Sequence, residues 1–236
     1  AAIVLQDDRF PTIAAAIEEG RVIFDNIRKF VFYLFSCNLA EVLVLVVAGL
    51  AGYPLPLLPL QILWLNLVTD TFPALALAIE PAEGDVMRRP PRDPDEAILS
   101  RGFVRAIGAY AALITAATVA VFVIALAGDG AAYSRAVTMS FATLGLAQAL
   151  HLGNARRRGA VLSIDAIVAN RWALGSVFLV AALQLLAVQF APLGRVLHTV
   201  PHGARDWLIV VALAGLLYSR RVVAVARAWH GRAEPG

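Results

Sequence analysis

Long apolar stretches dominate the pattern of hydrophobic and polar positions along this chain. A membrane-spanning helix needs about 20 consecutive, predominantly apolar residues. Five stretches reach this length. A sixth reaches it only if the helix continues through Arg220 and Arg221, whose long side chains would then extend to the membrane surface. The pattern therefore predicts an all-α, polytopic membrane protein with six transmembrane helices, at Phe30–Leu50, Leu57–Ile79, Ala106–Gly128, Ala136–Ala155, Trp172–Gly194 and from Trp207 onward.

The composition supports a membrane protein and narrows its partners. Hydrophobic residues make up 60% of the chain and charged residues 16%, whereas soluble domains average about 45–50% and about 25%. The net charge of +3 is too small to indicate a nucleic-acid partner, so the expected partner is the lipid bilayer. A single cysteine, Cys37, excludes an internal disulfide and a multi-cysteine metal site.

Basic residues predict the orientation of the chain in the membrane. Seventeen of the 20 Lys and Arg residues fall in the N-terminal segment, in the second-to-third and fourth-to-fifth connectors and at the C-terminal end. Only Arg135, Arg195 and Arg205 fall on the other side. Because positive residues favour the cytoplasmic side, both termini are expected to be cytoplasmic.

The segment before the first span is expected to form a stalk. Pro11 suits the first turn of a helix, and the run Thr12–Lys29 is amphipathic enough to continue into the membrane. The sequence therefore predicts one long helix that crosses from the cytoplasm into the bilayer, with Gly20 as its possible weak point.

Only two acidic residues, Glu41 and Asp70, fall inside predicted spans. A charge at the centre of a bilayer costs about 2.5–3.5 kcal/mol even on insertion scales, so such residues are candidates for function. Asn38 shares a helix face with Glu41, and Asn66 and Thr69 share one with Asp70. The alternative is a polar clamp between two helices, with both carboxyl groups protonated.

The chemistry of this group predicts a site for a hard cation. Pro73 removes a backbone hydrogen bond and clashes with the carbonyl of Thr69, and such freed carbonyls are tolerated where they line a cavity. Amide, carboxylate, hydroxyl and carbonyl oxygens suit Ca²⁺ and are poor ligands for copper or zinc. Cys37 is expected to pack in the core, and His151 is expected at the membrane interface.

The motifs "SCNLAE", "LQILWLNLVTDTFPALAL" and "MRRPPRDP" resemble the fifth and sixth transmembrane helices of P-type cation ATPases and the loop after them. The match is closest to the calcium-pump branch. The opening resembles the end of the phosphorylation domain and its stalk, and the remaining spans fit the seventh to tenth helices in number and topology. This resemblance is specific over residues 1–101.

The resemblance assigns metal-ligand roles to particular residues. Asn38 and Glu41 match ion ligands of the family's fifth helix, and Asn66, Thr69 and Asp70 match those of the sixth. Two-site calcium pumps have a glutamate in the eighth helix, where this chain has Gln148, a neutral ligand. "DTF" at residues 70–72 is similar to plasma-membrane-type calcium pumps, which usually lack the glutamate present here as Glu41. The number of ions transported therefore stays open.

The resemblance implies the cation-binding and translocating part of an ATP-driven pump. The expected cargo is Ca²⁺ with proton counter-transport, in the plasma membrane of a bacterium. ATP and Mg²⁺ would act only in the head, whose Asp-Lys-Thr-Gly-Thr and Thr-Gly-Glu-Ser motifs this sequence lacks. The expected partners are those N-terminal pump domains, so the chain is read as a fragment, a separate subunit or a truncated product. It is not expected to hydrolyse ATP alone.

The sequence leaves two other functions open, and the resemblance implies a chain organised in five parts. A non-pumping remnant could bind a partner or act as a scaffold, and a passive cation pathway fits least because one off-centre carboxylate cluster does not predict a continuous polar pore. The five parts are the end of the phosphorylation domain and stalk (1–28), an ion-binding helix pair (29–80), a cytoplasmic loop (81–105), a four-helix support domain (106–228) and a cytoplasmic tail (229–236).

Overall fold

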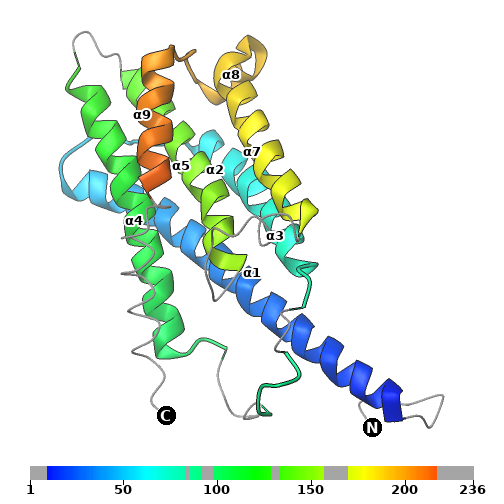
Figure 1. The fold of residues 1–236 in the computed structure, drawn as a ribbon. Coiled ribbons are helices and arrows are strands. Elements are labelled where there is room, and N and C mark those ends of the chain that lie inside the picture. The colour runs from blue at the N-terminus through cyan, green and yellow to red at the C-terminus, as the bar shows by residue number, and fades with distance from the viewer. Residues whose placement is uncertain (1–9, 83–85, 92–97, 129–132, 157–169, 217–236) are drawn as a thin grey trace.

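The computed structural model describes residues 10–82, 86–91, 98–128, 133–156 and 170–216. Within these ranges every regular element is a helix, which confirms the all-α, polytopic class predicted from the sequence (Figure 1). The cytoplasmic tail at 229–236 and the continuation of the sixth span through Arg220 and Arg221 lie outside the described residues.

The first helix, α1 (Phe10–Leu50), is unbroken over 41 residues. At 1.5 Å per residue it is about 60 Å long, twice the thickness of the hydrocarbon core of a bilayer. Its N-terminal part extends beyond the other helices (Figure 1). The predicted long, unbroken helix is therefore confirmed, and Gly20 lies within it without a break.

The second span consists of three consecutive segments, α2 (Pro59–Leu65), η1 (Asn66–Asp70) and α3 (Thr71–Ala78). The middle segment η1 is a π-helix, a wider turn that inserts one residue and often marks a functional site. Pro73 lies in the first turn of α3 and has no N–H to offer the carbonyl of Thr69. The predicted disturbance near Thr69 is therefore present, as a π-helix within a continuous span.

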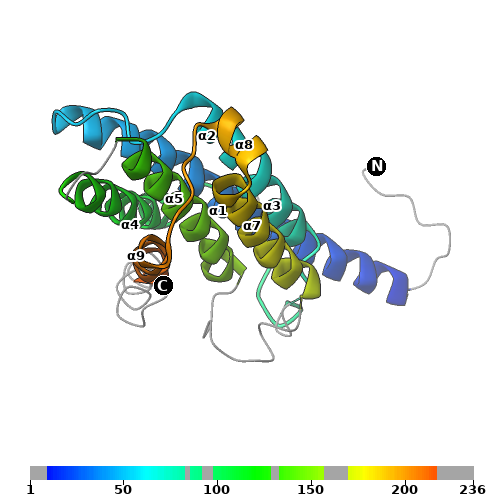
Figure 2. The ribbon, with the colours of Figure 1, turned by 90° about the horizontal axis from the view of Figure 1, so that it is seen from above.

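The remaining helices surround α5, which lies at the centre of the bundle (Figures 1 and 2). In the most apolar stretch of α5, 83% of the residues are buried, against 33–50% in the other four spans. The helices around it contact one another through their inner faces and leave their outer faces apolar and exposed. The helices after α3 are α4 (Arg101–Leu126), α5 (Tyr133–Arg156), α7 (Arg171–Gln189), α8 (Ala191–Leu197) and α9 (Ala204–Gly215).

Two predicted spans differ from the structure in extent. The fifth span was expected to run to Gly194, but α7 ends at Gln189, Phe190 is extended, and α8 follows as a separate short helix. Pro192 explains the break, since a proline is tolerated in the first turn of a helix and not in its interior. Of the sixth span the described part, α9, has 12 residues, so five helices here are long and apolar enough to cross a membrane.

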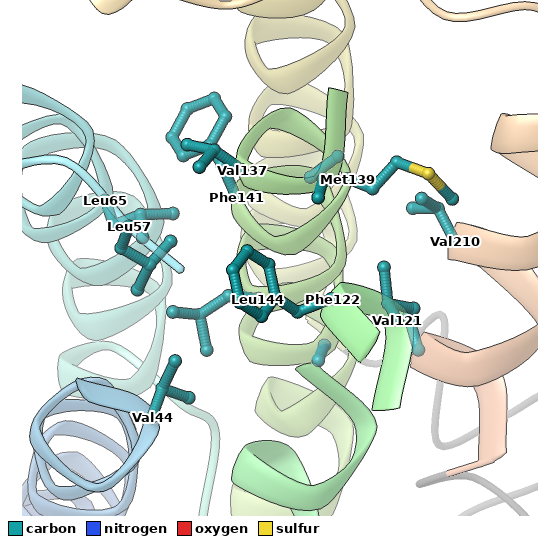
Figure 3. Close-up of a cluster of buried hydrophobic side chains, with 14 of the residues drawn as sticks. Val44, Leu57, Leu65, Val121, Phe122, Val137, Met139, Phe141, Leu144 and Val210 are labelled. Atoms are coloured by element: carbon teal, nitrogen blue, oxygen red, sulfur yellow. The ribbon is translucent and has the colours of Figure 1, made fainter. Parts of the chain in front are cut away.

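A hydrophobic core joins α1, α2, α4, α5 and α9 (Figure 3). Val44 lies one turn beyond Glu41 on α1, and Leu144 lies one turn before Gln148 on α5. The polar side chains of the span interior therefore border a close-packed apolar layer that fixes the spacing of their helices. The labelled members of this cluster are Val44, Leu57, Leu65, Val121, Phe122, Val137, Met139, Phe141, Leu144 and Val210.

Candidate cation site

The structure brings all the predicted ligands together from three elements. The helix α1 contributes Asn38 and Glu41, and the central helix α5 contributes Gln148. The π-helix η1 contributes the others, Asn66, Thr69 and Asp70.

Each of the two carboxylates is contacted by side-chain amides. The Asn38 amide donates to Oδ2 of Asp70 at 3.0 Å. The carboxylate of Glu41 accepts at both oxygens, from Asn66 at 2.8 Å and from Gln148 at 3.0 Å. Among the described residues neither carboxylate has a Lys, Arg or His partner. Neutral donors stabilise a carboxylate without cancelling its charge, so the two acids remain available to a cation.

Thr69 connects the π-helix to α5. Its hydroxyl lies 2.9 Å from Oε1 of Gln148 and donates to the carbonyl of Leu65 at 2.7 Å. The side chains of Thr69 and Gln148 have no exposed surface. Gln148 thus contacts both Thr69 and Glu41, and it holds η1 and α1 at a fixed distance across the central helix.

The freed carbonyl of Thr69 is bound by a residue that the sequence analysis missed. The hydroxyl of Tyr33 donates to this oxygen at 2.7 Å, and Tyr33 is fully buried. A buried unpaired carbonyl is costly, so this bond stabilises the π-helix that presents Asn66 and Asp70. A signal was available, because residues 33, 37 and 41 are spaced i, i+4 and i+8 and share one face of α1.

The site is buried on one side and open on the other. Glu41 is 4% exposed and Asp70 is 5% exposed, whereas Asn38 is exposed and Asn66 is half-buried. Oδ1 of Asp70 is buried and has no hydrogen-bond partner among the described residues. A carboxylate oxygen in this state can accept a ligand bond without first breaking another contact.

The donor set suits a hard cation. The contributing atoms are carboxylate, amide and hydroxyl oxygens, which are the ligands that Ca²⁺ takes in proteins. In the described parts of the chain, no three or more His, Cys, Asp or Glu residues lie close enough together to hold a metal ion by themselves. The site therefore depends on its amides and its hydroxyl as much as on its two acids.

Two nearby residues test the remaining expectations. Cys37 is completely buried in a second hydrophobic cluster, as predicted. The interfacial position expected for His151 is wrong, since its ring has no exposed surface. The rings of Phe32, Tyr33 and Tyr110 pack against it and shield it from water.

Comparison with known proteins identifies the family. The family model described as "Cation transporting ATPase, C-terminus" matches residues 54–219. A "Calcium-transporting ATPase" of Bacillus subtilis is 41% identical over 91% of this chain and 24% of its own length. "Calcium-transporting ATPase 1" of Bacillus cereus is 34% identical over 90% of this chain and 26% of its own, and "Probable cation-transporting ATPase F" of Mycobacterium bovis is 36% identical over 90% and 23%.

The chain belongs to the cation-transporting ATPases and is the C-terminal membrane part of a P-type cation pump. It spans about a quarter of the length of the curated relatives it matches. It is an integral membrane protein, in which the residues matched to the family's fifth and sixth helices lie on α1 and η1.

Proposed function

We propose that this chain binds and translocates Ca²⁺ within an ATP-driven pump, at the site formed by Asn38, Glu41, Asn66, Thr69, Asp70 and Gln148. The observation that carries the proposal is the pairing of two buried carboxylates with neutral amides alone, together with the unpartnered oxygen of Asp70. Two relatives, the calcium-transporting ATPases of Bacillus subtilis and Bacillus cereus, support Ca²⁺ as the cargo.

Proton counter-transport follows from the burial of the two acids. When the cation leaves, each carboxylate must either take a proton or remain a bare charge within the membrane, which is expensive. We infer that protons neutralise Glu41 and Asp70 in the cation-free state and are exchanged for the next Ca²⁺.

The open side of the site supports the need for the other pump domains. Asn38 is exposed although it contacts Asp70, so a further helix of the pump can complete the cation's coordination there. We propose that the pump lies in a bacterial plasma membrane with the Arg156 end of α5 in the cytoplasm. ATP and Mg²⁺ would act in the phosphorylation and nucleotide domains.

Transport by the full-length protein in inverted membrane vesicles tests this function. We expect ATP-dependent uptake of Ca²⁺, with an opposite movement of protons reported by a pH-sensitive dye inside the vesicles. We also expect phosphorylation from ATP that requires Ca²⁺, while the 236-residue chain alone forms no phosphoenzyme. Phosphorylation that is indifferent to Ca²⁺ but requires another cation would reject the assignment of the cargo. Absence of any cation-dependent phosphorylation would favour the non-pumping alternative.

A further inference from the structure

A second buried polar cluster lies at the end of the span that carries the site. Glu80 lies two residues beyond α3 and is 5% exposed. Both of its carboxylate oxygens accept from Nε of Arg156 at the end of α5, at 3.0 and 3.1 Å, and Nη2 of the same arginine lies 2.9 Å from Oε1. This ion pair joins the end of α3 to the central helix.

Asn170 attaches the same carboxylate to a third helix. Its amide donates to Oε2 of Glu80 at 2.6 Å and to the carbonyl of Ala76 at 3.0 Å. Its side-chain oxygen accepts from the backbone N–H groups of Trp172 and Ala173, which makes Asn170 the N-cap of α7. The side chain of Asn170 therefore caps α7 and binds both the last turn of α3, at Ala76, and the side chain of Glu80, two residues beyond that helix.

The backbone of this junction is held by the stalk. The Asn26 amide on α1 donates to the carbonyl of Glu80 at 2.8 Å and to that of Ala78 at 3.3 Å. Slightly farther along the chain, Arg21 donates to the carbonyl of Arg89 at 2.8 Å, and Arg89 pairs with Asp25 at 2.6 Å. The segment after α3 is thus bound to α1 through its backbone and to α5 and α7 through the Glu80 side chain.

The cluster is better explained by positioning than by stability. A buried ion pair is weak evidence for stability, because the cost of desolvating two charges offsets most of their attraction. What the pair does is fix where α3 ends relative to α5 and α7. At the other end of α3 lies the π-helix, whose wide turn is the least regular part of the span.

We propose that Glu80 is a positioning residue for cation binding, which holds the end of α3 on α5 and α7 so that stalk movements rearrange η1. With this end anchored, a displacement of α1 against the bundle is taken up at the π-helix, where it changes the spacing of Asn66, Thr69 and Asp70 from Asn38 and Glu41. Without the anchor, α3 and η1 would follow α1 together and the spacing would change less. This inference rests on the proposed function of the site.

The test separates the loss of the anchor from the cost of an unpaired buried charge. In the full-length protein we compare Glu80→Gln, Arg156→Met and the double variant, by melting temperature in detergent and by the Ca²⁺ concentration that gives half-maximal phosphorylation from ATP. Each single change leaves one charge buried and unpaired, so both should lower the melting temperature. The double variant removes both charges, and its melting temperature should return close to that of the unmodified protein. Its half-maximal Ca²⁺ concentration should still rise about fivefold or more, the lower range of couplings between sites in proteins.

A milder variant keeps the ion pair intact. Asn170→Ser retains a hydroxyl that can cap α7 but cannot donate to both Glu80 and Ala76. It should raise the half-maximal Ca²⁺ concentration in the same direction, and because the ion pair remains it should lower the melting temperature less than either single change at Glu80 or Arg156. If the double variant does not fold, the Ca²⁺ dependence of Asn170→Ser shows whether the Glu80 junction positions the cation site.

The ion pair between Arg135 and Asp206 provides the matched control, because it joins α5 to α9 at the opposite end of α5. The double variant Arg135→Met with Asp206→Asn should leave the Ca²⁺ dependence of phosphorylation unchanged. The anchor is rejected if Glu80→Gln with Arg156→Met shows unmodified Ca²⁺ dependence, or if the control pair shifts it equally. If the unmodified protein shows no Ca²⁺-dependent phosphorylation, the proposed function itself fails.

Discussion

The cation site and the Glu80 junction are both buried, and both are built around carboxylates, yet they are neutralised differently. At the junction the carboxylate of Glu80 is matched by the guanidinium of Arg156, with Asn170 supplying one further bond. At the candidate cation site the donors to Glu41 and Asp70 among the described residues are all amides, from Asn38, Asn66 and Gln148.

Under the proposed function, this difference separates a permanent cluster from an exchangeable one. A carboxylate paired with arginine is neutral as a unit and has no need of a mobile cation. A carboxylate held by amides is oriented but keeps its charge, so a cation or a proton must supply the compensation. The burial of an acidic residue therefore does not by itself mark a candidate transport site, because the partners of the carboxylate decide whether it needs a mobile cation.

The largest effect on cation binding is expected from Asp70→Asn in the full-length pump. The change keeps the shape of the side chain and removes the charge that the unpartnered Oδ1 offers. Loss of one partner from a buried charge interaction costs about 2 kcal/mol or more, so the Ca²⁺ concentration for half-maximal phosphorylation should rise about thirtyfold or more. Phosphorylation from inorganic phosphate, which proceeds from the cation-free state, should survive. Unchanged affinity for Ca²⁺ would leave the protonated polar clamp as the better account.

Arg156→Met should give the largest effect on stability. Glu80 would remain buried without its cation, and breaking a buried pair in this way costs about 3–5 kcal/mol. We expect a clear fall in the melting temperature in detergent, measured against Arg135→Met, whose side chain is 32% exposed and should cost less. Equal melting temperatures for the two variants would mean that the Glu80 junction is no more tightly held than the pair at the other end of α5.

Glu41→Gln should have an intermediate effect on the cation site. The amide preserves the volume of the side chain and its contact distance to Gln148 but removes one of the two site charges. We expect the half-maximal Ca²⁺ concentration to rise about tenfold, which corresponds to about 1.4 kcal/mol. The measurement is Ca²⁺-dependent phosphorylation at fixed ATP. A larger effect than that of Asp70→Asn would show that the cation is held mainly on α1.

The smallest effect is expected from Gln148→Ala. The change removes hydrogen bonds to Glu41 and Thr69 but no charge. Of the two, only the bond to Glu41 positions a charged ligand, and a hydrogen bond contributes about 1 kcal/mol, so a shift of about fivefold or less in Ca²⁺ affinity is expected. Direct binding of radioactive Ca²⁺ measures it, with the neighbouring Leu146→Ala as the control. An effect as large as that of Asp70→Asn would contradict the order proposed for the three residues.

The candidate ligands could be predicted from the sequence because the helical repeat is local. Asn38 with Glu41, and Asn66 with Asp70, are spaced i, i+3 and i, i+4, so a helix brings each pair onto one face wherever it packs. The spans were predicted for the same reason, since about 20 apolar residues in a row have few alternatives to crossing a membrane. The long first helix could be predicted because the sequence shows no helix-breaking proline between Pro11 and Leu50.

What the sequence left undetermined depends on contacts between distant residues. Arg156 lies 76 residues beyond Glu80, and nothing local to either residue identifies the other. His151 was placed at the interface because it lies near the end of a span, but neighbouring helices supply an aromatic pocket that covers it. The partner of the Thr69 carbonyl is on another helix, so the proline predicted the freed oxygen and not the Tyr33 hydroxyl that binds it.

The π-helix at Asn66–Asp70 contains one residue more than a regular α-helical turn would hold. If one residue were removed between Leu65 and Thr71, the segment could close into a regular α-helix. Because the wide turn takes up its extra residue locally, α2 and α3 would keep their orientation, and Glu80 would still face Arg156. Within the turn, however, the directions of Asn66, Thr69 and Asp70 relative to one another would change. The extra residue therefore serves the polar side chains of this turn rather than the packing of the helices on either side of it.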